Sequence, residues 1–517
     1  MNAALLLLAI SLGAEPVSAD FVLKNGTLFD GSGRPGVVGD AAIKGERIVA
    51  VGNFTVAGNP KTIDCTGLFI APGFIDLHTH SDEPLLHPET RANLNYLRQG
   101  VTTVVTGNCG LGPTNVAVYF EELRNGGVGS NVIHLIPHNN LKAQVMGNVS
   151  RLPTAKEMAE MERLIDKGMN DGAWGISTGL IYNPGTYSKT EEIIALAKVV
   201  AKHGGIYASH IRGEGSTVLD SIEEALRIGR EAGLPVHISH LKASGRSVWN
   251  GKAAEAVGLI KQARASGQAV TADQYPYIAS STSLRATVVP PRFREGSQED
   301  FVARISNKET GPKLRKAIEE HLQQNQNGAD LRIARYQRRP EWQGKDLVTI
   351  AEMEAKTPLD IVLEIEKNGG AQIVHFSMSE DDVRLIMKQD FVATASDGSA
   401  MVPSSTVPHP RGYGCFACKI GRYSIEDRAL PVEQAIRSAS GLPADILKLP
   451  ERGYLRPTFF ADIVVFDPKT YRDTATYDRP HQYANGVKWL FINGKCVIEN
   501  GADKSPLAGR VLKHREK

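Results

Sequence analysis

The sequence has little net charge and no long hydrophobic run beyond its first residues. The formal net charge is +2, and charged residues make up 22% of the chain. Such a balance gives no electrostatic reason to expect a nucleic acid or a membrane surface as partner. No stretch after the N-terminal segment is long enough to form a membrane-spanning helix. We therefore expect no nucleic-acid partner and no membrane partner after processing, and these features leave the oligomeric state open.

Cysteine is scarce and scattered, with five residues at positions 65, 109, 415, 418 and 496. An odd number leaves at least one cysteine without a disulfide partner. Cys415 and Cys418 form a single CxxC pair, and no second pair exists to complete a zinc ribbon. We expect this pair to lie in an ordinary loop, either reduced or joined as a local disulfide.

The first residues, MNAALLLLAISLGAEPVSAD, contain an apolar run from Ala3 to Leu12 and a small-x-small site that ends at Ala19. This pattern is typical of a cleaved signal peptide, here residues 1–19, and predicts export to the periplasm or the medium. No basic residue precedes the apolar run. The alternative is an apolar leader or a lipid-facing anchor, and if the leader is not a signal the protein would be cytoplasmic.

The pattern of short runs predicts an α/β barrel with a small β domain made from both chain ends. Residues 20–71 and 441–517 alternate β-rich runs with turns, as hairpins do. Residues 72–440 alternate apolar strands with helical stretches, which favours parallel βα units and a (β/α)8 barrel. Nine candidate strands are present, one more than a barrel needs. We expect residues 286–370 to form an insertion over the barrel mouth, and AQIVHFSM to belong to it.

Several apolar strands of the predicted barrel end in a side chain that can bind a metal. In a parallel barrel these ends converge on one face, where active sites are built. Singly, each is more often a hydrogen-bonded histidine, a small buried cysteine or a turn aspartate. Together they match the ligand preference of zinc. The candidate ligands are His78, His80, Cys109, His210, His240 and Asp397.

Several motifs together resemble the N-acyl-D-amino-acid deacylase (D-aminoacylase) family of the amidohydrolase superfamily. They are GFIDLHTHSD, TGNCG, GISTGLIYNPG, ASHIRGEG, ISHLKASG, DQYPYIASSTSL, ASDGSA and HPRGYGCF. The resemblance extends from about residue 21 to about residue 510. It implies a metal-dependent hydrolase barrel with a β-sandwich domain, a Zn²⁺ cofactor, and hydrolysis of N-acyl-D-amino acids to a carboxylate and a free D-amino acid.

The resemblance also implies roles for individual residues. Cys109, His210 and His240 would hold a tightly bound zinc ion, and His78, His80 and Asp397 would form a second, weaker site. Asp397 would carry a proton to the leaving amine. The implied substrate-binding residues are Lys242, Tyr275, Ser281, Met378 and Arg411.

Other interpretations of these residues stay open. Tyr277 is an alternative to Tyr275, Lys242 is alternatively a solvated charge at the rim, and Ser281 alternatively caps a turn. Met378 is as consistent with packing as with lining a pocket. Arg212 and Glu214 follow His210 and are expected to support the ligands.

Three rival functions remain. A D-dipeptidase on the same scaffold differs only in the acyl group. A cyclic-amide hydrolase is disfavoured because GAWGISTG holds no lysine to bridge two metals. A non-catalytic binding protein is disfavoured because all six candidate ligands are present. The preferred D-amino acid side chain and acyl group are not set by these motifs.

Overall fold

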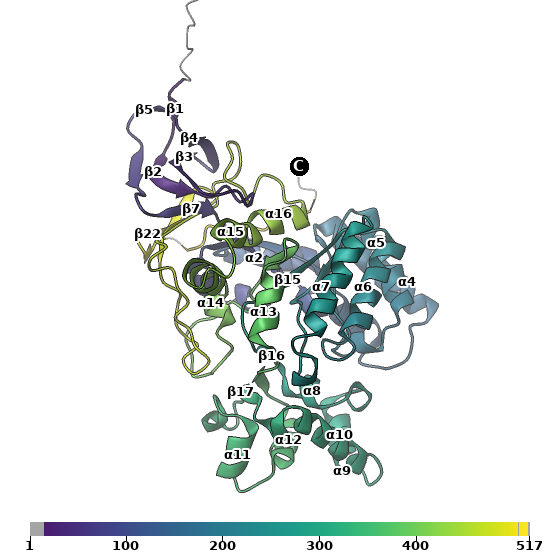
Figure 1. Cartoon of the computed structure of the whole chain (residues 1–517). Helices are drawn as coiled ribbons and strands as arrows, with labels where there is room; N and C mark the ends of the chain where they lie inside the picture. Colours follow the sequence, from purple (N-terminus) through teal and green to yellow (C-terminus); the bar gives the residue numbers. More distant parts are fainter. Residues whose placement is uncertain (1–14, 505, 515–517) are drawn as a thin grey trace, which may run out of the picture.

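The computed structural model describes residues 15–504 and 506–514 (Figure 1). Most of the predicted signal peptide, residues 1–14, therefore lies outside the described residues. Residues just before the predicted cleavage site form β1 (Val17–Ser18), which pairs with β5 (Val56–Ala57). Within the described ranges, no helix combines the length and the apolar character needed to cross a membrane.

Parallel strands form the centre of the molecule. Ladder pairing joins them in two sheets, β10-β9-β8 and β11-β12-β13-β14-β15-β19, and β10 leads into β11 after a single residue. The strands are β8 (Phe74–Asp76), β9 (Val101–Thr106), β10 (Asn131–His134), β11 (Ile136–Pro137), β12 (Gly175–Gly179), β13 (Ile206–His210), β14 (Val236–Ile238), β15 (Val270–Gln274) and β19 (Val392–Thr394).

Backbone hydrogen bonds connect the end of the last strand to the end of the first. Asp397 N donates to His78 O at 2.8 Å, and His80 N donates to Gly398 O at 2.7 Å. A parallel bridge between Thr79 and Gly398 lies between them. These bonds bring the polar residues that follow β8 and β19 side by side, as the barrel prediction requires.

Helices pack outside these strands, with α4 to α7 along one side of the molecule (Figure 1). Helices such as α4 and α6 are amphipathic and bury one apolar face. Those between or just after the barrel strands are α1 (Leu94–Leu97), α2 (Val116–Gly126), α3 (His138–Met146), α4 (Ala155–Asp171), α5 (Thr190–Lys202), α6 (Val218–Ala232), α7 (Lys252–Ala265), α13 (Glu380–Met387), α14 (Arg411–Ala417), α15 (Val432–Ala439) and α16 (Gly441–Leu447).

The segment between β15 and α13 is a separate lobe with its own hydrophobic core, which includes Trp342 and Leu347 (Figure 1). AQIVHFSM contributes a strand to this lobe, as expected, in the order β16-β18-β17. The lobe is wider than the predicted 286–370, since β16 precedes that range and β18 follows it. Its elements are β16 (Ser280–Ser283), α8 (Leu284–Val288), α9 (Gln298–Ser306), α10 (Thr310–Gln324), β17 (Leu331–Arg335), α11 (Leu347–Met353), α12 (Pro358–Lys367) and β18 (Gln372–His375).

Both chain ends meet in one nine-stranded sheet, as predicted, and lie together in Figure 1. The order is β23-β22-β21-β20-β7-β2-β3-β4, with β6 added beside β2, and the two ends join where β7 pairs with β20. The strands are β2 (Phe21–Leu28), β3 (Val37–Lys44), β4 (Arg47–Gly52), β6 (Lys61–Asp64), β7 (Phe69–Pro72), β20 (Ile463–Phe466), β21 (Val487–Ile492), β22 (Lys495–Glu499) and β23 (Ala502–Asp503).

The second β segment starts later than residue 441. Leu442 and Leu447 of α16 are buried in one cluster with Ile75 and Leu77 of the barrel, and the first strand begins only at Ile463. The sequence GLPADILKL is apolar on one side, so burial against the barrel favours a helix there over a hairpin.

The CxxC pair is helical, which corrects the expected loop and the alternative of a disulfide. Cys415 lies in α14, Cys418 begins a π-helix that extends to Glu426, and both thiols are buried and unbridged. The neighbouring Phe416 stacks on Phe74 with ring centres 5.8 Å apart. This packing overrides the low helix propensity of the glycines in HPRGYGCF.

A buried polar network fastens the β domain to the barrel. Arg452 pairs with Asp462, and its other terminal nitrogen donates to Asn493 Oδ1 at 2.8 Å. Asn131 of β10 donates to Asp462 Oδ2 at 3.2 Å, and Asn493 Nδ2 donates to Asn131 Oδ1 at 2.9 Å. All four side chains are buried, so each depends on the others for its hydrogen bonds.

We expect Asp462→Ala to lower the free energy of unfolding by about 3–5 kcal/mol, because it leaves the Arg452 charge buried without a partner. Urea denaturation followed by circular dichroism measures the change. The matched control is Glu160→Ala, which breaks an exposed pair with Arg163 and should cost at most about 1 kcal/mol. Equal effects of the two variants would contradict the role given to the network.

Candidate metal centre

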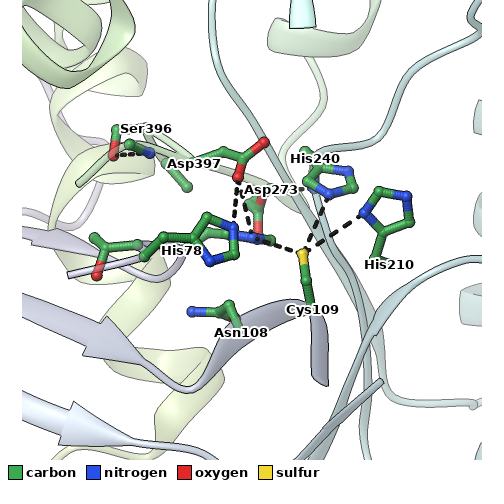
Figure 2. A network of polar contacts seen from close by, with 12 residues as sticks. His78, Asn108, Cys109, His210, His240, Asp273, Ser396 and Asp397 are labelled. Carbon is green, nitrogen blue, oxygen red and sulfur yellow. Dashed lines mark hydrogen bonds and ion pairs between the residues drawn. The ribbon is translucent and has the colours of Figure 1, made fainter. Parts of the chain in front are cut away.

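Cys109 lies at the centre of a cluster of histidines (Figure 2). Its Sγ is 3.3 Å from His78 Nε2, 3.6 Å from His210 Nδ1 and 3.6 Å from His240 Nε2. Two ligands of a tetrahedral zinc ion, with bonds of about 2.3 Å to sulfur and 2.0–2.1 Å to nitrogen, lie about 3.6 Å apart. The donor atoms therefore have the types and spacings that a zinc ion requires.

Asp397 extends the cluster toward the other side. Its Oδ1 is 3.0 Å from His80 Nε2 and 3.5 Å from His78 Nε2. Three donor groups result. His78 belongs to two of them, with Cys109 and His240 and with His80 and Asp397, and the third joins His210, Glu214 and His240. The structure thus brings all six predicted ligands together as one continuous set.

The backbone turns sharply at three of these ligands. Cys109 has a φ of 54°, His240 of 36° and Asp397 of 49°, in the left-handed region that non-glycine residues seldom occupy. Each follows closely after a barrel strand, so the turn directs its side chain across the strand ends. Strain of this kind persists where the surroundings impose it, and functional sites are a common place for it.

Burial holds His78 and His210 neutral. It lowers the pKa of His78 to about 4 and that of His210 well below its usual range. A neutral imidazole has the free lone pair that a metal needs. Burial also raises the pKa of the Cys109 thiol well above its usual value. A cation at the centre would reverse that shift, since metal binding deprotonates a coordinating thiol.

Two buried ion pairs flank the cluster. Arg411 lies 2.8 Å from Asp397 Oδ2, and Lys242 lies 2.5 Å from Glu214 Oε1. Burial opposes ionisation of Asp397, but Arg411 and the nearby histidines hold its pKa well below its usual range. Burial likewise opposes ionisation of Glu214, but Lys242 and the histidines lower its pKa. Both carboxylates are therefore charged at neutral pH.

Asp273 at the end of β15 is a site residue that the sequence analysis missed. Its Oδ1 accepts a hydrogen bond from His240 N at 2.6 Å, and its Oδ2 lies 3.4 Å from His78 Nδ1 and 2.8 Å from His237 Nε2. It thereby orients two candidate ligands at once. The signal was present in TADQYPY, where an acid stands at a strand end as Asp397 does.

Two cavities meet at the cluster, and both are lined by His80, Tyr182, Ser281, Thr282 and Asp397. Cavity A has a volume of about 910 Å³ and includes Arg411 and Val402 in its wall. Cavity B has a volume of about 750 Å³ and includes Cys109, His210, His240, Lys242 and Tyr275.

The predicted substrate residues have different positions. Tyr275 lines cavity B, its buried hydroxyl has no partner among the described residues, and its ring centre is 4.7 Å from the Arg411 guanidinium. Tyr277 instead packs on His409 and Tyr477. Geometry thus favours Tyr275 over the alternative.

Lys242 is 5% exposed, which excludes the solvated rim charge. Ser281 lies in β16 and donates to Ile373 O at 2.9 Å, so it belongs to a strand and does not cap a turn.

Two expectations are corrected. Met378 is buried in the barrel core and is not among the residues that line cavity A or cavity B, so packing explains it. The Arg212 guanidinium is occupied elsewhere, because it pairs with Glu224 at 2.8 Å and donates to the carbonyl of Thr186 at 2.9 Å. Of the two proposed supports only Glu214 contacts a ligand, with Oε1 3.0 Å from His240 Nδ1.

Comparisons with known proteins agree with this site. A model of the amidohydrolase family matches residues 61–498. The chain is 36% identical to a D-aminoacylase of Alcaligenes xylosoxydans xylosoxydans, over 95% of this chain and 97% of that protein. It is 35% identical to an N-acyl-D-aspartate deacylase of the same organism, over 97% of this chain and 96% of that one.

Two solved structures share the fold over 96% of this chain and the whole of their own. One is a D-aminoacylase studied for its binuclear metal centre, with a TM-score of 0.81 and 34% identity. The other is an N-acyl-D-glutamate deacylase of Bordetella bronchiseptica in complex with zinc and a phosphonate that mimics the tetrahedral intermediate, with a TM-score of 0.81 and 30% identity. These likenesses confirm the predicted fold class.

We expect Asp273→Asn to weaken zinc binding about 10–100-fold, because a neutral amide holds His240 and His78 less firmly than a carboxylate does. Competition with a chromogenic chelator measures the affinity. Asp330→Asn is the matched control, since Asp330 pairs with Arg246, outside the ligand cluster. Unchanged zinc affinity in Asp273→Asn would show that this carboxylate does not support the ligands.

Proposed function

The chain belongs to the amidohydrolase family, and we propose that it hydrolyses the N-acyl bond of N-acyl-D-amino acids to a carboxylate and a free D-amino acid. The observation that carries the proposal is the meeting of six metal-binding side chains with a carboxylate-binding arginine at one set of strand ends. Relatives that bear these activities in their names match nearly the whole chain. Membership of the family thus makes the chain an amide-hydrolysing enzyme. That its substrate is an N-acyl-D-amino acid is our proposal.

We propose zinc as the metal, held most tightly by Cys109, His210 and His240. The short distances from Cys109 Sγ to both histidines support this set. His78, His80 and Asp397 would hold a second ion less tightly, because His78 is shared with the first set through its 3.3 Å contact with Cys109 Sγ. When bound, zinc supplies Lewis acidity toward water and toward the amide carbonyl.

Asp397 is placed to move the proton. It is ionised at neutral pH, so it can accept a proton from the attacking water at one carboxylate oxygen. Its Oδ1 faces His80, and its Oδ2 faces Arg411. After the proton transfer the carboxyl group can donate to the leaving nitrogen, which must be protonated to depart as an amine.

Arg411 and Tyr275 are placed to bind the α-carboxylate of the substrate. A guanidinium binds a carboxylate through two parallel hydrogen bonds. The buried Tyr275 hydroxyl, which has no partner, would gain one from the same carboxylate. Lys242 is engaged with Glu214 and lies 2.8 Å from His240 Nδ1, so we assign it to positioning His240 as well as to the cavity wall.

We expect the enzyme to release free amine from N-acetyl-D-amino acids and not from their L-enantiomers, with activity lost on zinc removal and restored by added zinc. A ninhydrin-type assay over a panel of D- and L-substrates measures this. D-dipeptides and cyclic amides complete the panel. Faster cleavage of either class than of every N-acetyl-D-amino acid would replace the proposed substrate.

Asp397→Asn should lower kcat about 10²–10⁴-fold, because the amide can neither accept nor return the proton. The variant should keep one tightly bound zinc per chain, since Cys109, His210 and His240 are unchanged. Kinetics and metal analysis on the same preparation measure both quantities. Activity within tenfold of the wild type would exclude Asp397 as the proton carrier.

Tyr275→Phe should raise KM about tenfold, the cost of losing a hydrogen bond to a charged group. Stability should not fall, because the hydroxyl has no protein partner to lose. Tyr277→Phe is the matched control, because Tyr277 also has a buried unpaired hydroxyl but packs away from both cavities. The same KM change in both variants would refute a contact between Tyr275 and the substrate.

A further inference from the structure

The candidate metal centre lies where two cavities join, and an amide bond held there must direct its two halves into different spaces. Cavity A and cavity B share only five wall residues, among them His80 and Asp397 of the centre itself. One cavity must therefore take the amino acid and the other the acyl group. The geometry of the carboxylate-binding residues decides between them.

The amino acid half belongs in cavity B. Tyr275 and Lys242 line cavity B and not cavity A, and the Lys242 ammonium lies 5.6 Å from the centre of the Tyr275 ring. Arg411 reaches the same ring from the side of cavity A. An α-carboxylate held between Arg411 and the Tyr275 hydroxyl thus places the D-amino acid side chain in cavity B and the acyl chain in cavity A.

Cavity A is much larger than a small acyl group requires. An acetyl group fills little more than two water volumes, about 60 Å³, whereas the cavity measures about 910 Å³. Leu111 in its wall is 38% exposed, so part of its apolar side chain is in contact with water. Further apolar wall residues are Pro84, Ala334, Met401, Val402 and Pro408.

The buried charges in the wall of cavity A already have partners. Asp397 pairs with Arg411, and Asp82 Oδ1 accepts a hydrogen bond from Gly107 N at 2.5 Å. In the proposed function Asp397 serves the metal centre and Arg411 the α-carboxylate, while the other charged wall residues, Glu83 and Arg335, are exposed to water. No desolvated charge is therefore assigned to a charged acyl substituent such as the ammonium group of a dipeptide. An apolar chain along Leu111 and Val402 would instead bury surface that is now in contact with water.

On the basis of the proposed function, we propose that cavity A is the acyl site and selects apolar acyl chains of medium length, from hexanoyl to decanoyl. The class of substrate is then an N-acyl-D-amino acid that carries a fatty acyl chain. Hydrolysis adds water across the amide, giving the free fatty acid and the D-amino acid, so no further reactant is needed.

The test compares N-acetyl, N-hexanoyl, N-octanoyl and N-decanoyl derivatives of whichever D-amino acid the enzyme cleaves fastest as its N-acetyl form. We expect kcat/KM for the octanoyl substrate to exceed that for the acetyl substrate at least about tenfold, because each buried methylene adds favourable transfer free energy. A preference for acetyl, or no dependence on chain length, would overturn the acyl site. Failure to cleave any member would overturn the proposed function itself.

Two variants locate the acyl chain. Val402→Trp narrows cavity A and should reduce the octanoyl-to-acetyl ratio of kcat/KM at least fivefold. Thr287 lines cavity B and not cavity A, whereas Val402 lines cavity A and not cavity B. Thr287→Trp therefore narrows cavity B and should leave the octanoyl-to-acetyl ratio within twofold. Zinc content and thermal unfolding show whether each variant is folded. The opposite pattern, with the ratio lost only in Thr287→Trp, would overturn the assignment of cavity A.

Discussion

The structure depends on the balance of charge at the ends of the barrel strands. Arg411 and Lys242 each face one carboxylate, Asp397 and Glu214. Asp273 has no lysine or arginine partner in the described part of the chain. Burial raises the pKa of the Cys109 thiol, so without a metal the thiol is neutral. The Asp273 carboxylate is thus a buried negative charge without a permanent cation beside it, and a divalent cation would balance it together with the thiolate that Cys109 forms on binding the metal. The same cation would convert Cys109 to the ionised form that binds it.

The barrel makes this concentration of polar groups possible. Its strands are apolar over most of their length, so they pack against one another and against the helices. The free energy gained by this packing offsets the cost of burying the polar cluster. The left-handed turns at Cys109, His240 and Asp397 then direct side chains inward at the point where each strand has ended. Backbone bonds from Asp397 to His78 and from His80 to Gly398 fix the distance between the first and last ligands. Fold and site are thus joined through the backbone as well as through side chains.

The barrel, the shared β domain and the six candidate ligands could be predicted because each corresponds to a pattern within a short stretch of sequence. Apolar runs that end in His, Cys or Asp are visible without a structure. Asp273 was missed because an acid at a strand end gains meaning only from what it touches, here His240 and His78. Arg212 was wrongly expected to support the ligands for a related reason. Its position next to His210 in the sequence does not show that its guanidinium binds Glu224 and the carbonyl of Thr186. The helical CxxC segment depends on packing between Phe416 and Phe74, distant in the chain.

The joining of both chain ends in one sheet affects how the protein is made. Strand β7, which ends at Pro72, pairs with β20, which begins at Ile463. At the usual speed of protein synthesis, roughly 5–20 residues each second, tens of seconds separate the two strands on the ribosome. During that interval β7 presents an unpaired edge, and the Asp462 partner of Asn131 does not yet exist. The β domain can therefore be completed only after the whole barrel has been synthesised, and the free edge of β7 needs protection until β20 is available to pair with it.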